Sequence, residues 1–507
     1  MKHNQLKLGT LLSYLRMGLG TVISLLYTPT MIRLLGQSEY GLYNTVASTI
    51  SMLSILSMGF NSGYIRYYAK YKKEDMDAVY RLNGLFLLIF TGIGAVALVC
   101  GLFLSNHLEL VFSTGLTANE YAIAKKLMLV LTVNLALSFP MSVMANIVTA
   151  NERYVFHKVL SILKTVTGPM VTLPLLLMGY GSVAIVAVTV ALNILVDLCH
   201  LYYVLVILKN RFYFRGIDRH LAEGLLSFTA FIALNMLVDQ VNDHVDQLLL
   251  GRYVGTAAVA VYSVGYALSH YFMLFSTSVS SVFTPRIHGI VHATQHDRDE
   301  QRRQLTDLFV RVGRVQCLIL MLVATGLLFY GKYFITRIWA GPEYEESYYV
   351  MLLLVLPALI HLIQNLGIEI QRAQNKHRFC SVVYLLMAAI NLSMTIVLCQ
   401  RYGAIGATVG TAVSLLVANG LIMNIYYHKN CNVDILRFWS SIMRLLRGLI
   451  LPLIYGCISN RMFASDSLFV YCVQIVLYTA VYCGSMWFFG MNDYEKQLIG
   501  RFIRRMR

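Results

Sequence analysis

The sequence has few charged residues for its length. Only 13% of its 507 residues are Asp, Glu, Lys or Arg, whereas soluble domains carry about 25%. The hydrophilic segments between the long apolar runs are also short, and the longest, 286–304, has about 19 residues. A segment of that size cannot fold into a catalytic domain. The composition therefore excludes a soluble protein, and the short loops argue against an enzyme.

Metal-binding and disulfide patterns are missing as well. The nine cysteines include no CxxC pair, and most lie within apolar runs, where they resemble small apolar side chains. His288, His292 and His296 recur at every fourth position, but no cysteine lies near them, so we predict no metal site and no bound cofactor. The Asp75-Met76-Asp77 triplet resembles the D-x-D of sugar transferases, yet it lies in a short loop without a nucleotide-binding domain.

Long apolar runs dominate what is present. Hydrophobic residues make up 57% of the chain, and about 20 consecutive apolar residues are enough to cross a bilayer as a helix. The sequence predicts an all-α polytopic membrane protein with about fourteen transmembrane helices, at 9–32, 41–64, 83–104, 122–149, 159–178, 183–207, 224–250, 257–285, 305–331, 347–371, 381–400, 404–428, 445–460 and 467–490.

The basic residues indicate the orientation of these spans. The net charge is +16, but the 41 Lys and Arg punctuate the apolar runs instead of forming a soluble patch, so we predict no nucleic-acid partner. Most of them lie on the side of the N-terminus, and the loops of the opposite side hold only six: Arg33, Arg252, Lys332, Arg337, Arg401 and Arg461. The positive-inside rule then places both termini in the cytoplasm.

The chain also contains an internal repeat. Three motifs recur at nearly constant offsets of 219, 223 and 222 residues. The matched motifs are Gly36 and Tyr43 with Gly255 and Tyr262, Ala150-Asn151-Glu152-Arg153 with Ala373-Gln374-Asn375-Lys376, and Tyr180-Gly181 with Tyr402-Gly403. Transporters built from two such halves place their site between them and expose it alternately. We therefore predict six-helix lobes at 1–215 and 216–430, followed by two further helices and a basic tail at 431–507.

The first span carries a full charge. Ser13, Arg16, Gly20, Ser24 and Tyr27 lie on one stripe of this helix. An arginine near the centre of a membrane costs roughly 2.5–3.5 kcal/mol on insertion scales. Arg16 should therefore face a wet cavity or a partner.

Several stretches resemble a known family. They are LLGQSEYGLY after the first span, GFNSGYIRYYAKY at the end of the second, ANERY after the fourth and DQLLLGRYVGTAAVAVYSVGYAL across the seventh and eighth. Over roughly the first 430 residues the chain resembles Wzx-type polysaccharide-biosynthesis flippases of the multidrug/oligosaccharidyl-lipid/polysaccharide (MOP) superfamily, which includes the MATE transporters. The extra C-terminal pair resembles the lipid II flippase branch, where it is associated with a groove for the lipid tail.

The resemblance implies a function and a location. It implies a bacterial inner-membrane protein that moves a polyprenyl-diphosphate-linked oligosaccharide from the cytoplasmic to the periplasmic leaflet. Its setting would be the synthesis of a surface polysaccharide such as the O-antigen of lipopolysaccharide, beside glycosyltransferases and a glycan polymerase. The alternatives are a cation-coupled multidrug exporter of the same superfamily and a membrane-embedded glycan polymerase or ligase. A drug exporter is expected to carry an acidic residue where this chain has Arg16.

Because a diphosphate is an anion, the candidates for binding it are the cationic residues within the predicted spans. Arginine binds phosphate with charge-assisted and often bidentate hydrogen bonds. Arg16 is the first candidate, with Tyr27 on the same stripe for the glycan, and Lys164, Arg311 and Arg314 follow. The last three also lie near enough to the cytoplasmic edge to extend their charges into water, which is the structural alternative.

The seventh span carries an acidic face. Asn235, Asp239, Asn242 and Asp246 lie within about 60° of one another on a helix, and Asp243 borders them. Carboxylates inside a membrane must be paired, protonated or bound to a cation. We predict that Asp239, with Asn235, couples transport to H⁺ or Na⁺. Asp243 fits either coupling or contact with external water, and Asp246 fits a structural role.

Overall fold

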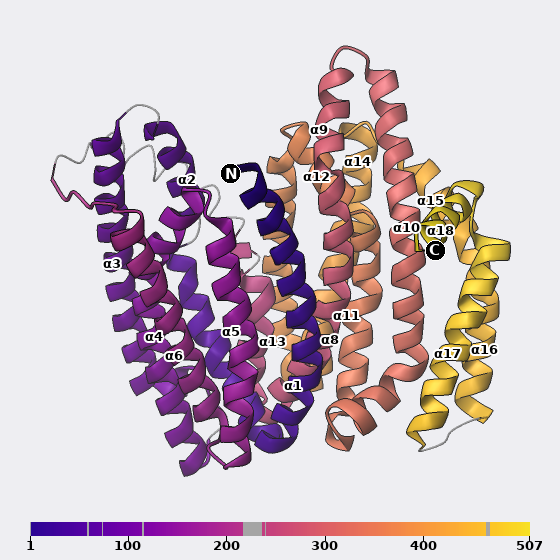
Figure 1. The fold of residues 1–507 in the computed structure, drawn as a ribbon. Helices are drawn as coiled ribbons and strands as arrows, with labels where there is room; N and C mark the ends of the chain where they lie inside the picture. Colours follow the sequence, from indigo (N-terminus) through magenta and orange to yellow (C-terminus); the bar gives the residue numbers. More distant parts are fainter. Residues whose placement is uncertain are drawn as a thin grey trace. The chain divides into compact units, whose positions relative to one another are not determined.

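The computed structural model describes residues 2–57, 60–72, 75–113, 116–215, 236–238, 240–462 and 467–506. These residues form helices and turns, and the described part of the chain contains no strand (Figure 1). Contacts divide the chain into two compact units, Met1–Ser263 with Cys399–Ala404, and Val264–Leu398 with Ile405–Arg507. The all-α membrane fold predicted from the sequence is confirmed.

The first unit is built around long helices that pack side by side. α3 packs along α4, α4 along α6, and α1 along α5. Its elements are α1 (Lys2–Leu53), α2 (Phe60–Tyr71), α3 (Met76–Asn106), α4 (Ala118–Ala150), α5 (Tyr154–Leu177), α6 (Gly181–Tyr202), a helix at 240–253, the first turns of α8 (Thr256–Ser280), short 3₁₀ turns at Ser54–Ser57 and Leu108–Leu110, and a π-helical turn at Tyr203–Ile207.

The second unit contains the rest of α8 and the C-terminal helices. α10 packs against both α11 and α15, and α16 packs against α17. Its other elements are α9 (Thr284–Ala293), α10 (Arg298–Tyr333), α11 (Glu346–Ile363), α12 (Leu366–Ala373), α13 (His377–Leu415), α14 (Met423–Asn430), α15 (Ile435–Leu446), α16 (Ile450–Met462), α17 (Leu468–Ser485), α18 (Asp493–Met506), 3₁₀ turns at Ser281–Phe283, Pro342–Tyr344 and Arg447–Leu449, and π-helical turns at Phe334–Trp339, Leu416–Ile422 and Met486–Gly490.

Eleven stretches of the described chain are long and apolar enough to span a membrane. Two of them, Leu8–Ser57 and Arg378–Asn430, run for 50 and 53 residues, about twice the length that a bilayer needs. Each turns at a glycine with positive φ, Gly36 at 73° and Gly403 at 57°, and so contains two of the predicted spans. Most of the predicted seventh span lies outside the described residues, so the total of fourteen stays a prediction.

The backbone reproduces the internal repeat. Few residues other than glycine adopt a positive φ, and the described chain has four of them, Glu152, Lys209, Asn375 and Asn432. They form two pairs with equal spacing in the sequence, Glu152 with Asn375 and Lys209 with Asn432. The second pair was not found from the sequence, because Lys and Asn share no side-chain chemistry. The glycines of the other two predicted matches, Gly36 with Gly255 and Gly181 with Gly403, also have positive φ.

The first compact unit extends to Ser263, whereas the predicted N-terminal lobe ends at residue 215. The start of α8 belongs to the first unit because it packs directly on α1: a Cβ on Gly41 would lie only 1.8 Å from the carbonyl oxygen of Thr256. Hydrogen bonds extend this contact, from Ser48 to Gln247 and from Gln247 to Ser263. The compact units are defined by contacts, whereas the predicted lobes are defined by the sequence repeat. The contacts therefore do not test the lobe boundaries, which stay predictions.

Candidate functional site

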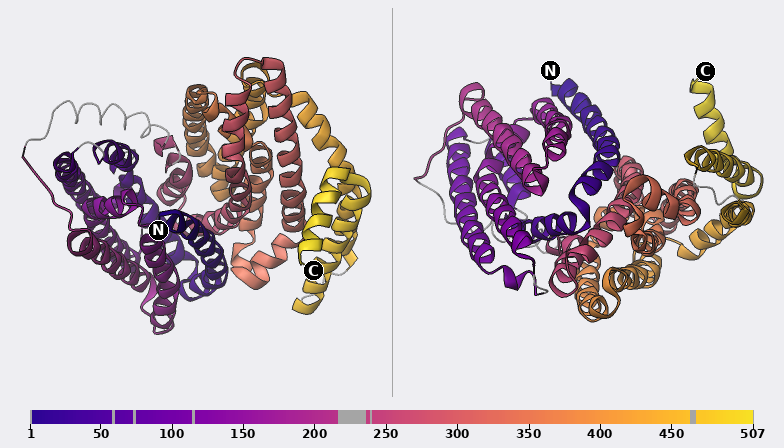
Figure 2. Two further views of the ribbon diagram at one scale, coloured as in Figure 1. Left: turned by 45° about the horizontal axis from the view of Figure 1, so that its top comes forward. Right: turned by 90° about the horizontal axis from the view of Figure 1, so that it is seen from below.

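α1, which carries Arg16, runs alongside α5 (Figure 2). The two helices are close there, since a Cβ on Gly20 would be 3.7 Å from the Thr165 methyl group. Within its unit Arg16 is exposed, and its charge is near enough to act on both Lys164 and His157 of α5. Two cations predicted separately from the sequence, Arg16 and Lys164, are therefore brought together.

α6 supplies the counter-charge and the support for this cluster. Asp197 interacts electrostatically with Lys164, and both side chains are half-buried. His200 Nδ1 lies 2.9 Å from the Val196 carbonyl oxygen, which can only accept, so this nitrogen carries a proton. In neutral His200 the Nε2 then accepts from His157 Nδ1, 3.1 Å away. Among the described residues of this cluster, one acid, Asp197, accompanies two cations, Arg16 and Lys164, so positive charges outnumber negative ones.

Sequence reasoning missed His157. The signal was present in the spacing, because His157, Ser161 and Lys164 follow one another at intervals of four and three residues and so share a face of α5. His157 went unnoticed because its partner His200 is on another helix. Tyr27 belongs to the same side of the first unit, where it reaches Thr172 on α5 and lies near Tyr43.

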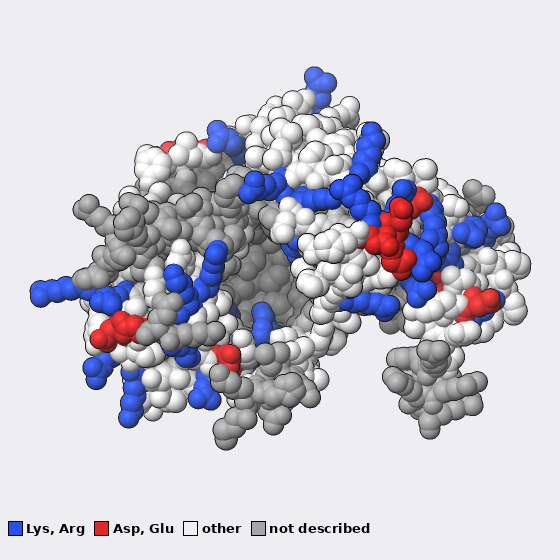
Figure 3. All heavy atoms as spheres, turned by 90° about the horizontal axis from the view of Figure 1, so that it is seen from above, with Lys and Arg blue, Asp and Glu red and all other residues white. Residues whose placement is uncertain are grey.

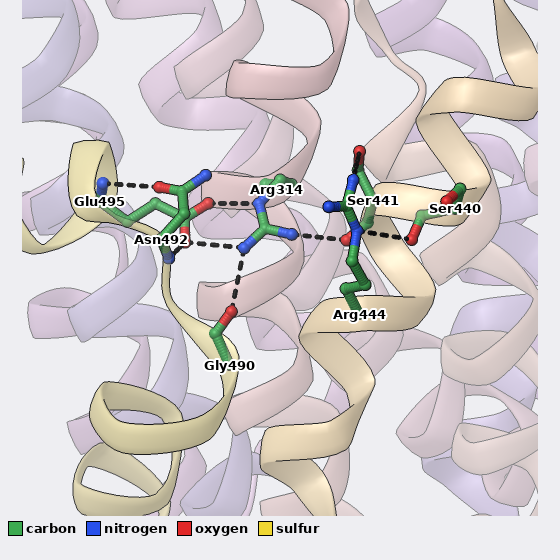
Figure 4. A network of polar contacts seen from close by, with 7 residues as sticks. All are labelled: Arg314, Ser440, Ser441, Arg444, Gly490, Asn492 and Glu495. Carbon is green, nitrogen blue, oxygen red and sulfur yellow. Dashed lines mark hydrogen bonds and ion pairs between the residues drawn. The ribbon is translucent and has the colours of Figure 1, made fainter.

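Arg314 lies in the second unit, and its donors are already occupied (Figure 4). Its guanidinium makes two contacts to Glu495, with Nη2 2.9 Å from Oε2, and it also donates to the backbone carbonyls of Gly490 and Ser441. The exposed fractions of the Arg314 and Glu495 side chains are 6% and 2%. Arg314 therefore ties α10 to the C-terminal helices. This role differs from both predictions, because the buried side chain does not extend its charge into water and its donors are bonded within the protein instead of being left for a phosphate.

Arg311, three residues earlier on α10, is exposed. Its guanidinium lies over the ring of Tyr494, 5.3 Å from the ring centre. The interval of three residues predicted that Arg311 and Arg314 would be neighbours on one helix. It could not predict that one would be buried in an ion pair and the other would face a cavity.

The acidic face of the seventh span is described only in part. Asn235 and Asp239 lie outside the described residues, so their predicted role in coupling stays a prediction. Asp243 is exposed, in agreement with the alternative that it contacts external water. Asp246 is 1% exposed and accepts a hydrogen bond of 2.8 Å from the hydroxyl of Tyr262. This buried contact gives Asp246 a structural role.

Two sets that could suggest other chemistry have structural explanations. Asp75 caps the N-terminus of α3 by accepting hydrogen bonds from the backbone of Asp77 and Ala78. Glu369 and Arg372, three residues apart on α12, form an ion pair of 2.7 Å. In the described part of the chain, no group of three His, Cys, Asp or Glu side chains is placed to hold a metal ion.

α1 has one acidic residue, Glu39, and it is not near Arg16 in the sequence. Its Oε1 accepts hydrogen bonds from the backbone and the hydroxyl of Ser182 at the start of α6. The first 38 residues contain no Asp or Glu at all. Lys and Arg side chains cover more of the face shown in Figure 3 than Asp and Glu do.

A sequence profile described as polysaccharide biosynthesis protein matches residues 30–348, more than half of the chain. The chain belongs to this family. Among curated proteins, this member of the polysaccharide biosynthesis family is similar to a probable low-salt glycan biosynthesis flippase, Agl15, of Haloferax volcanii. The two are 20% identical over 196 residues, which cover 39% of this chain and 40% of that protein. The match thus spans less than half the length of the relative.

Solved structures show the same fold. The lipid II flippase MurJ in an inward closed conformation has a TM-score of 0.69 at 14% identity, covering 94% of this chain and 97% of that chain. An inward-facing multidrug resistance MATE transporter of the MOP superfamily has a TM-score of 0.66 at 11% identity, covering 84% and 98%. The polysaccharide biosynthesis family member therefore has the MOP superfamily fold, and the resemblance inferred from its motifs is confirmed.

Proposed function

We propose that this polysaccharide biosynthesis protein is a flippase. It moves a polyprenyl-diphosphate-linked oligosaccharide from the cytoplasmic to the periplasmic leaflet by alternating access between its two lobes. Family membership supports a role in polysaccharide biosynthesis, and flippases occur both among its sequence relatives and among proteins of the same fold. Transport of a preformed substrate requires no covalent chemistry, in keeping with the lack of a catalytic domain.

The cationic cluster of α1 and α5 carries this proposal. Arg16 and Lys164 place two permanent charges near each other, with His157 beside them and Asp197 as the acid that acts on Lys164. Such an excess of positive charge suits an anionic diphosphate, and arginine adds donors in a fixed fork. Tyr27 lies further along the stripe of Arg16, and we propose that it contacts the sugars.

The transport cycle needs a source of energy. We propose that a proton or sodium gradient supplies it through Asp239, assisted by Asn235, with Asp243 as a further ligand. The protein requires no other cofactor in this scheme. Its partners are the lipid-linked oligosaccharide, the surrounding lipids, and the glycosyltransferases and polymerase that make and extend the glycan.

The proposed location is the bacterial inner membrane with both termini in the cytoplasm. The rarity of Lys and Arg in the loops of the opposite side supports this orientation. The loop at 105–121 then faces the periplasm, and the turn between α9 and α10 faces the cytoplasm.

A cation-coupled multidrug exporter is the second candidate, because MATE transporters share the fold. The charges of α1 argue against it. A cationic drug would meet Arg16 where an exporter of cations needs a carboxylate, and the first acid of α1, Glu39, is held by Ser182.

Reconstitution in liposomes separates the two candidates. Purified protein should move a fluorescent polyprenyl-diphosphate oligosaccharide to the outer leaflet of the liposome. An external reagent destroys the fluorescence there, so the loss of fluorescence measures the movement. Arg16→Ala should slow this movement, whereas Arg33→Ala, a change of the same charge at the predicted outer loop, should not. Transport of a cationic dye without movement of the lipid-linked sugar would favour the exporter and refute the flippase.

A further inference from the structure

The second unit contains a cavity with many arginines that the transport site does not involve. Its volume is about 510 Å³, and it lies between α10, α15 and the segment that leads into α18. Five arginines line it together with a single acid, Asp307: Arg311, Arg314, Arg437, Arg444 and Arg447. Figure 4 shows part of its wall, where Arg314 and Arg444 both donate hydrogen bonds to Ser441.

Two of these arginines are already neutralised. Arg314 is paired with Glu495, and Arg437 lies 2.8 Å from the carboxylate of Asp307. The other three have no ion pair within 4 Å among the described residues. Arg444 donates to Ser440 and Ser441, at 3.4 and 3.2 Å. The cavity therefore keeps an excess of three positive charges.

The three remaining arginines are suited to bind an anion. Arg311 lies over the ring of Tyr494 in a cation–π contact, and such a contact does not use the N–H donors of the guanidinium as hydrogen bonds to a carboxylate or phosphate would. Arg444 and Arg447 are exposed at the end of α15 and in the turn that follows it. Several guanidinium groups around one cavity match the tetrahedral oxygens of a phosphate group, which accepts bidentate hydrogen bonds.

Exposed apolar residues in the cavity lining and next to it in the sequence indicate the source of that phosphate. Phe489 lines the cavity and has an exposed fraction of 63%. On α15, Leu436 and Met443 precede Arg437 and Arg444 directly, and their exposed fractions are 73% and 59%. A helix with an exposed apolar side and adjoining arginines is typical of a membrane interface, where basic residues contact phosphate headgroups.

We propose that this cavity binds the phosphate headgroup of an anionic membrane phospholipid, with its acyl chains against Phe489, Met443 and Leu436. The bound lipid joins α15 and the segment before α18 to α10, because its phosphate contacts arginines of both α10 and α15. This site is separate from the cluster of Arg16 and Lys164, and it does not depend on the identity of the transported substrate.

Native mass spectrometry of the purified full-length protein in detergent tests the proposal. It measures the binding of phosphatidylglycerol. The wild type should prefer phosphatidylglycerol to phosphatidylcholine. The double variant Arg444→Gln/Arg447→Gln should bind phosphatidylglycerol about 25-fold more weakly, since each interfacial cation contributes roughly a factor of five. The matched control Arg298→Gln/Arg303→Gln, with the same loss of charge at exposed positions of α10, should bind as the wild type does.

Three outcomes would overturn the assignment. Equal loss in both double variants would mean that net charge alone attracts the lipid. Complete competition by millimolar inorganic phosphate would identify a small-anion site, and displacement by an equimolar polyprenyl diphosphate would identify a substrate site. If Arg444→Gln/Arg447→Gln fails to fold, Arg444→Lys/Arg447→Lys replaces it in the test. This variant retains both charges, so it should keep most of the binding.

Discussion

Arg314 of α10 and Glu495 of α18, 181 residues apart in the chain, form a buried ion pair with two contacts that connects the two helices. Backbone groups complete the site, because Asn492 N–H donates to Glu495 Oε2 and the Gly490 carbonyl accepts from Arg314. The pair thus holds the segment before α18 against α10, and Arg314 lines the arginine-rich cavity.

Removal of one partner should destabilise the second unit strongly. Glu495→Gln leaves the Arg314 charge buried and uncompensated, at a cost of about 3–5 kcal/mol. The double change Arg314→Met/Glu495→Leu removes both charges and should recover much of that loss. The effect is measured by heating the detergent-solubilised protein and monitoring the loss of folded protein by size-exclusion chromatography. A Glu495→Gln protein as stable as the wild type would contradict the buried pair.

Two glycines of α1 should respond in opposite ways to the same substitution. Gly41→Ala drives a methyl group into the carbonyl of Thr256, which should cost about 1–3 kcal/mol or more because backbone cannot move aside easily. Gly18 has no atom within 4 Å of an added Cβ, so Gly18→Ala should be neutral or stabilise the helix by about 0.5–1 kcal/mol. The thermal unfolding assay compares them directly, and equal effects would exclude the close contact with α8.

Arg16 should matter for transport more than for folding. Arg16→Ala should lower the rate of oligosaccharide movement about tenfold to a hundredfold, as expected for loss of a hydrogen bond to a charged group. Arg16→Lys should retain part of the rate, because lysine keeps the charge but lacks the forked donors.

Quantitative immunoblotting controls for the structural alternative. If Arg16 serves only to pair with a carboxylate, Arg16→Ala should reduce protein abundance, and neutralising that carboxylate should restore it. Normal abundance together with unchanged transport would contradict both roles.

The coupling residue can be separated from its structural neighbour. Asp239→Asn should remove the dependence of transport on an imposed proton or sodium gradient. Asp246→Asn is the matched control, because an asparagine oxygen can still accept the hydrogen bond from Tyr262. Transport into liposomes under each gradient is the measurement. Insensitivity of the wild type to both gradients would refute the coupling role of Asp239.

Labelling with an impermeant thiol reagent checks the orientation. Glu109→Cys, in the loop predicted to face the periplasm, should react from outside in spheroplasts, and Gln295→Cys, between α9 and α10, should react only after permeabilisation. Both native positions are exposed. Cys457, Cys472 and Cys483 should first be changed to Ser, because they are exposed too. The reverse labelling pattern would invert the proposed topology.

The sequence by itself determined the class of fold and the repeat. Apolar runs long enough for a bilayer leave few alternatives to helices, because every backbone polar group in a membrane must be satisfied locally. The matches at Gly36 and Gly403 marked turns where only a residue without a Cβ adopts the required conformation easily. Cations such as Arg16 were recognisable because a charge in an apolar run is costly whatever surrounds it.

Only the tertiary structure decided what each charge does. Helical spacing made Arg311 and Arg314 equivalent candidates, but packing buried Arg314 against Glu495 and left Arg311 at an open cavity. It also placed Arg16 beside Lys164, and His157 beside His200, across helix pairs that no local pattern connects. The physical reason is that the cost of a buried charge depends on the partners brought to it, and those partners lie on helices distant in sequence.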